Sequence, residues 1–168
     1  DGYTIYVNEE QVGHHEDWTS TEGYSFNAPC DSPTIYALDL YDTGGIASVI
    51  ADINHCGETI LTSTAWKCAQ FDNGPPDGWT SATFDDTLWP EAGDAGDNGV
   101  GPWGDVNRDM GMNSAGTVSP TAEWIWTADN EAHNDIYCRL TVPCGRPAGP
   151  AGPPPPAQIP HTLEGATA

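Results

Sequence analysis

The sequence predicts an all-β domain, an antiparallel β-sandwich of the jelly-roll type with long loops and a Pro-rich extended C-terminal tail. Three observations support this prediction. Short runs of β-branched and aromatic residues recur between turns rich in Gly, Asp, Asn and Pro. No stretch has the sustained period of 3.6 residues that a core-facing helix needs. From Gly145 onward the composition changes to Pro, Gly and Ala.

Six runs are predicted to be strands, and many short strands between such turns are typical of a sandwich or jelly roll. The runs are YTIYVN, TIYALDLYD, IASVIADI, ETILTSTAW, EWIWT and DIYCRLTV. The first ends at a turn with the sequence NEE. In the second, alternation gives two faces: Ile35, Ala37 and Asp39 on one, and Tyr36, Leu38 and Leu40 on the other.

The 168 residues are predicted to form one domain, 1–144, and an extended tail, 145–168. Residues 72–116 are rich in Gly, Asp and Trp and poor in strand signals, which predicts long loops. These loops are either functional or simply held by tryptophans packed on the sandwich. In the tail, Pro153 to Pro156 are consecutive. Proline fixes φ and has no N–H, so the tail is predicted to be polyproline II-like.

Charge excludes several classes of partner. Four Lys and Arg residues stand against 25 Asp and Glu, a formal net charge of −21. Such a surface repels phosphate backbones and anionic lipids, so neither nucleic acid nor a membrane surface is an expected partner. No apolar run approaches the roughly 20 residues that span a bilayer, which argues against membrane insertion. The chain opens on Asp1 and shows no signal peptide, which indicates a mature, processed protein.

The five cysteines indicate an oxidising, extracellular environment, secreted or at the cell surface. They are Cys30, Cys56, Cys68, Cys138 and Cys144. None has a CxxC or Cys/His spacing typical of zinc, so disulfides are expected. The sequence does not select the pairing. We favour Cys30 with Cys56 and Cys68 with Cys138, which leaves Cys144 over beside the tail.

Four stretches carry a resemblance to a known type of module. They are DGYTIYVNEEQVG, GETILTSTAWKC, GWTSATFDDTLWPEA and AEWIWTADNEAHNDIYCRLTV, and they cover most of residues 1–142. They resemble motifs of the galactose-binding-like jelly rolls that precede the catalytic domains of rhamnosidases and related glycoside hydrolases. The resemblance implies that fold and leaves the ligand open, because the fold serves many functions.

The chain departs from that pattern in two ways. Glu9 stands where the turn of these modules usually has Gly. In those modules, the segment that contains WIW and the strand after it precedes the YVNG segment. In this chain the corresponding segment comes last. Either the domain is circularly permuted, with 124–142 folding back beside residues 3–7, or this segment and the tail pack on the next subunit. An unpaired edge strand accepts such a strand, and a non-closing head-to-tail contact builds a filament.

We therefore predict an extracellular structural subunit that self-assembles head to tail into a glycosylated fibril or surface matrix. The residues expected at the joint are Trp124, Trp126, Tyr137, Arg139, Pro143 and Ile159. The alternative is a monomeric, lectin-like carbohydrate-binding module of a glycoside hydrolase, with the tail as a linker. Its sugar-stacking candidates are Trp18, Trp79 and Trp103, which could equally be core or loop-anchoring residues.

Glycans are expected on the tail. No N-x-S/T sequon occurs, and Asn54-His55-Cys56 matches only the rare Cys variant. Pro-rich segments with Ser or Thr are typical of O-glycosylated stalks, and hydroxyproline would add attachment points. The candidate positions are Pro153, Pro154, Pro155, Pro156 and Thr162.

No catalytic activity and no required cofactor are predicted. The stretch HHED lacks the HExxH spacing of a zinc site and is expected to be an exposed polar loop after a turn. In FDDTLW, the resemblance implies that the two acids cap a turn, while Phe84 and Trp89 pack.

The sequence suggests one structural metal ion, calcium. Asp105, Asn107 and Asp109 alternate as in the first half of a calcium loop, and Asp94 and Asp97 could complete a looser site. The match to an EF-hand then fails at Met110 and Gly116. The alternative is a solvated acidic loop.

Overall fold

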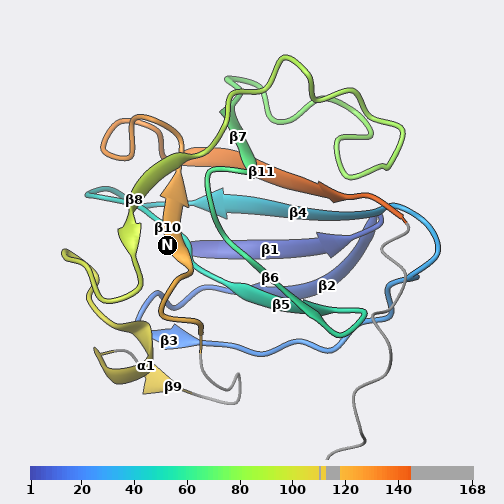
Figure 1. Cartoon of the computed structure of the whole chain (residues 1–168). Coiled ribbons are helices and arrows are strands. Elements are labelled where there is room, and N and C mark those ends of the chain that lie inside the picture. The colour runs from blue at the N-terminus through green and yellow to red at the C-terminus, as the bar shows by residue number, and fades with distance from the viewer. Residues whose placement is uncertain (110, 113–117, 145–168) are drawn as a thin grey trace, which may run out of the picture.

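A five-stranded antiparallel sheet forms the centre of the domain (Figure 1). The computed structural model describes residues 1–109, 111–112 and 118–144. The strand order is β2-β1-β4-β11-β7. The bounds are β1 Gly2–Val7, β2 Glu10–His15, β4 Thr34–Tyr41, β7 Lys67–Gln70 and β11 Asp135–Val142. The predicted all-β, antiparallel class is confirmed, whereas the finer jelly-roll topology stays a prediction.

Shorter elements surround this sheet. Two antiparallel pairs are β5 Asp52–His55 with β6 Glu58–Leu61, and β8 Gly93–Asp97 with β10 Glu123–Trp126. A short parallel pair joins β3 Ser20–Thr21 to β9 Gly111–Met112, and the helix α1 spans Val106–Asp109. Strand β8 lies within the predicted loop region. It lacks β-branched and aromatic residues, and it forms because β10 offers it a partner.

Strand β4 is buried on both faces, and its alternation divides the core as predicted. Tyr36, Leu38 and Leu40 belong to one cluster, which also holds Trp66, Ile125 and Trp126. Ile35 and Ala37 belong to a second cluster on the opposite face, under Trp79 and Trp89. The sheet is therefore covered on one side by the β5–β6 and β10 region and on the other by the loop that follows β7.

The last strand corrects the prediction of strand donation. β11 lies within the chain's own sheet, where Cys138 faces Leu38 of β4 and Cys68 of β7. The segment thus folds back into its own chain, as the first alternative predicted, but β4 lies between it and residues 3–7. The side chains of Trp124, Trp126, Tyr137 and Arg139 are buried in this chain, so they cannot form a joint with a neighbour.

Two local predictions in the N-terminal hairpin need a similar correction. Gly13, directly before HHED, is a buried strand residue where the expected turn would lie, and a Cβ there would lie 2.7 Å from the Tyr24 ring. His14 and His15 consequently end β2 instead of lying in a loop. The β1–β2 turn has Asn8 and Glu9 at φ 47° and 73°, the left-handed conformation that tight hairpins require.

The run IASVIADI, predicted to be a strand, is mostly not one. Only its end belongs to β5, which starts at Asp52. Upstream, Val49 makes an isolated antiparallel bridge to Ile125, with hydrogen bonds of 3.0 and 2.9 Å between their backbones. This contact ties residues 46–51 to β10 rather than to a long strand of their own.

Candidate functional site

A shallow, mostly apolar depression of about 700 Å³ lies beside the short edge strand β7, and we call it the β7 cleft. One wall is the loop 71–90, the other is the loop 127–133, and β7 forms the floor. The lining residues are Cys68, Ala69, Gln70, Phe71, Pro76, Phe84, Asp85, Leu88, Trp89, Pro90, Thr127, Ala128 and His133.

The first wall is built from aromatic residues that pack on the sheet. Trp89 stacks on Trp79 with ring centroids 6.2 Å apart, and Phe71 and Phe84 contact Trp89 at 5.2 and 5.7 Å. Trp79 also meets Tyr137 of β11 edge-on at 5.3 Å. Because aromatic pairs of this kind gain energy beyond their buried area, the loop is held without regular secondary structure.

An ion cluster pins the same wall to two strands. Asp86 Oδ1 accepts a hydrogen bond of 3.0 Å from Lys67 Nζ of β7. The other carboxylate oxygen, Oδ2, lies 2.9 Å from Arg139 Nε of β11. The Nε–H does not point along that line, so the second contact is an ion pair rather than a hydrogen bond. Arg139 Nη1 donates to the Trp79 carbonyl at 2.9 Å. Burial lowers the pKa of the Arg139 guanidinium and Asp86 opposes this, so the arginine stays charged.

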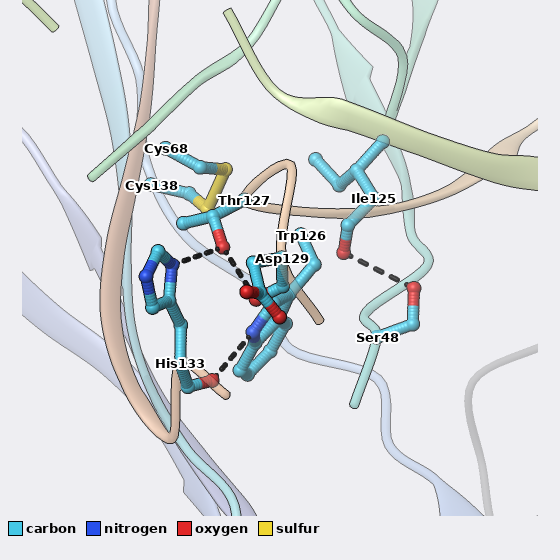
Figure 2. Close-up of a disulfide and its surroundings, with 8 residues drawn as sticks. All are labelled: Ser48, Cys68, Ile125, Trp126, Thr127, Asp129, His133 and Cys138. Atoms are coloured by element: carbon cyan, nitrogen blue, oxygen red, sulfur yellow. Dashed lines mark hydrogen bonds between the residues drawn. A yellow bond between two sulfur atoms is a disulfide. The ribbon is translucent and has the colours of Figure 1, made fainter. Parts of the chain in front are cut away.

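The second wall is held by hydrogen bonds around Thr127 (Figure 2). The Thr127 hydroxyl donates its one proton to the Asp129 carbonyl at 3.0 Å, so it accepts from His133 Nδ1 at 2.8 Å. Trp126 Nε1 donates to the His133 carbonyl at 2.8 Å. Below this loop the Cys68–Cys138 disulfide joins β7 to β11. Both walls therefore belong to a fixed framework.

Leu88 is the most exposed apolar residue of the lining, because 95% of the residue is exposed. It lies beside the buried Trp89 and shares the rim with Asp85, Gln70 and His133. An apolar floor, a projecting leucine and a few polar groups suit the binding of a ligand or chain segment better than a reaction.

The two acids of FDDTLW are both committed to structure. Asp85 Oδ1 accepts the Thr87 backbone N–H at 3.0 Å, and hydrogen bonds from the Thr87 side chain and backbone lower the pKa of Asp85. A general acid needs the opposite shift. Asp86 is held between Lys67 and Arg139. This pair therefore gives no support to glycosidase chemistry.

The three tryptophans proposed for sugar stacking have different environments. Trp79 is buried in the second core cluster and presents no free ring face, which corrects that prediction. Trp103 is half-buried and stacks on Trp124 at 5.1 Å. Trp18 is 62% exposed and is the one that could present its ring to a sugar.

The predicted calcium ligands are not gathered into one cluster among the residues described. Asn107 bonds the Val118 backbone through both its amide nitrogen and its oxygen. Asp94 accepts the Gly96 N–H, and Asp105 accepts the Asn107 N–H. In the described part of the chain, no three His, Cys, Asp or Glu residues could together hold a metal ion. The Asp109 side chain lies outside this description, so calcium binding stays a prediction. A higher melting temperature in millimolar calcium than in chelator would support it.

The cysteines are joined in the pairs that the sequence analysis favours. Cys30 bonds Cys56, and Cys68 bonds Cys138. Cys144 is exposed and has no disulfide partner in the described ranges. Pro143 is exposed as well. The predicted sites Ile159, Pro153 to Pro156 and Thr162 lie outside the described residues.

The β7 cleft itself was missed by the sequence analysis. Phe71 and Gln70 carry no distinctive signal. Leu88 lies inside a recognised motif, but nothing in the motif marks it as more exposed than its neighbours. The Lys67–Asp86–Arg139 cluster could have been suspected, since its members come from three of the four resembling stretches.

Comparison with known proteins gives one partial similarity. A segment of 47 residues, 28% of this chain, is 45% identical to an alpha-L-rhamnosidase of Streptomyces avermitilis, of which it covers 4%. No family model and no solved structure matches the chain. Among the described residues, no helix is long and apolar enough to cross a membrane. The similarity supports a relation to a carbohydrate-related module of a glycoside hydrolase, and the enzyme's own activity does not follow for this short segment.

Proposed function

We propose that the protein is a non-catalytic extracellular structural subunit that associates head to tail into a fibril or matrix through its tail, 145–168. The observation that carries the proposal is the polarity of β11. Its first residues lie beside the β7 cleft, since Ile136 pairs with Gln70. Its last residue, Val142, pairs with Thr34 at the other end of the sheet, where the chain leaves toward the tail (Figure 1). The strand therefore begins beside the cleft lining at Gln70 and ends at Val142, away from Gln70.

Charge supports the tail as the contacting part. The chain has a net charge of −21, and the tail contributes nothing to it because Arg146 and Glu164 cancel. Two acidic domains repel each other, whereas a neutral segment approaches such a surface without that penalty. Assembly through the tail therefore replaces assembly through a donated strand.

Two disulfides support an oxidising, extracellular location. A glycan on Thr162, beyond the segment of consecutive prolines, belongs to the same proposal, since it would keep the end of the tail solvated. Mass spectrometry of the tail released from native protein tests this part.

Removing the tail tests the assembly directly. The full chain is compared with a chain ending at Pro143 by light scattering over a range of concentrations, with matched salt. We expect the mass of the full chain to grow with concentration and that of the shortened chain to stay at one subunit. Equal masses for the two at every concentration would refute the proposal.

A second candidate is a carbohydrate-binding module of a glycoside hydrolase, which the partial similarity to the rhamnosidase favours. The exposed ring of Trp18 would be a stacking platform in this case. Glycan-array binding that is lost in Trp18→Ala, together with a monomeric full chain, would favour this candidate over the first.

A further inference from the structure

The β7 cleft combines an apolar lining with a leucine that has almost no contacts. Leu88 is 95% exposed, about twice the exposed fraction of Ile46 or Val100, which are 47% and 48% exposed. Phe71, Phe84 and Trp89 lie beside it in the same lining. Leu88 thus extends the apolar lining of the cleft out to its rim, where apolar groups of a partner can contact it.

The tail has the chemistry that such a surface recognises. Segment 147–156 reads PAGPAGPPPP. Aromatic-lined grooves bind proline-rich segments because a polyproline II helix loses little entropy on docking and presents apolar rings. Gln70 lies in the lining and is exposed, so its amide can donate to the carbonyls of a segment in which proline provides few N–H groups.

The direction of β11 favours a neighbour over the chain's own tail. The strand passes the cleft wall at Arg139, whose guanidinium lies 5.0 Å from the Phe84 ring centroid, and it runs on to Val142, about 10 Å further at ~3.4 Å per residue. To reach its own cleft, the chain would have to reverse within a proline-rich sequence. Such sequences behave as semi-rigid extended spacers, so reversal is disfavoured.

We propose that the β7 cleft, at Phe71, Phe84 and Leu88, is the docking site for the proline-rich segment 147–156 of a second copy. This inference rests on the proposed head-to-tail function and assigns its receiving surface. The segment is long enough for the role, because its ten residues extend to about 31 Å at ~3.1 Å per residue.

The test compares two exposed apolar residues in the full chain. Leu88→Ser alters the cleft, and Ile46→Ser is the matched control outside it. Both are made in a Cys144→Ser background, which removes disulfide-linked dimers. Sedimentation velocity over a concentration series measures self-association. We expect Ile46→Ser to associate like the parent and Leu88→Ser to associate at least about tenfold more weakly, because a leucine is no longer buried.

A peptide provides a second readout that does not depend on folding of a variant. A synthetic 147–160 peptide should compete with self-association of the parent, and the same peptide with alanine at 153–156 should not. Self-association that neither Leu88→Ser nor the peptide weakens would overturn the cleft assignment and leave the proposed function standing. A parent that stays monomeric at every concentration would overturn both the cleft assignment and the proposed function. This outcome includes a tail that binds the cleft of its own chain.

Discussion

Arg139 of β11 and Asp86 of the loop 71–90 form an ion pair of 2.9 Å that fastens the first wall of the β7 cleft to the sheet. The Arg139 side chain is 1% exposed, and it also donates a hydrogen bond to the Trp79 carbonyl. Because the guanidinium is buried, its charge depends on Asp86 for compensation.

Asp86→Ala should therefore be strongly destabilising. Removing one partner of a buried pair leaves the other charge uncompensated, which costs about 3–5 kcal/mol in the free energy of unfolding. Lys67→Met is the matched control, since Lys67 contacts the same carboxylate but its side chain is 29% exposed. This substitution should lower the free energy of unfolding by about 1 kcal/mol or less. Urea unfolding measures both. Equal small losses would show that Arg139 does not depend on Asp86.

Asp39 should make stability depend on pH. Burial, and then the charge of Asp135, raise the pKa of Asp39 in the folded protein. An acid whose folded pKa is raised destabilises the fold as pH rises from its unfolded value toward the folded one. Asp39→Asn should thus be more stable than the parent at pH 7, and this gain should disappear below about pH 3.8.

Asp17→Asn is the control of opposite sign. Hydrogen bonds from the Thr19 side chain and backbone lower the pKa of Asp17, so its carboxylate contributes stability above its unfolded pKa. This variant should lose stability at pH 7 and match the parent in acid. Urea unfolding from pH 3 to 7 measures both variants, and a less stable Asp39→Asn at pH 7 would contradict the burial argument.

The two disulfides should contribute unequally. Cys68 and Cys138 are separated by 70 residues in sequence, and Cys30 and Cys56 by 26. Loop-closure entropy predicts that replacing the first pair by alanine costs about 4.4 kcal/mol and replacing the second about 3.5 kcal/mol. The first pair is also buried, which widens the difference. Denaturant unfolding of the two double variants checks the order, and a greater loss for the Cys30–Cys56 pair would reverse it.

Glu9→Gly should stabilise the β1–β2 hairpin. Glu9 has φ 73°, and a residue with a Cβ in the left-handed conformation costs about 1–2 kcal/mol. Glycine also increases the entropy of the unfolded chain, which offsets part of this relief. The net gain in the free energy of unfolding should be about 0.5–1 kcal/mol. Gln11→Gly in the neighbouring strand β2 should instead lose stability, because it has the entropy cost without the relief. Thermal unfolding distinguishes the two signs.

The sequence predicts the parts of this fold that depend on local pattern. Alternation in β4 indicates its two buried faces, and DIYCRLTV has the bounds of β11. It does not predict which strand β11 pairs with, because that choice depends on the whole sheet. The exchange of motif order suggested a missing strand, yet the chain fills that place itself.

The candidate site was less predictable for the same reason. The β7 cleft is formed by residues from three separate segments, with Phe71, Leu88 and His133 brought together only by tertiary packing. Burial also removed a predicted role, since Trp79 anchors the loop instead of facing a ligand. A Trp-rich loop alone cannot distinguish an anchor from a platform.

Negative-stain imaging of the native full chain, with a chain ending at Pro143 as its partner sample, tests the central claim most directly. Head-to-tail association through the tail predicts filaments one subunit wide for the full chain and separate particles for the shortened one. Separate, single-subunit particles in both samples would contradict it.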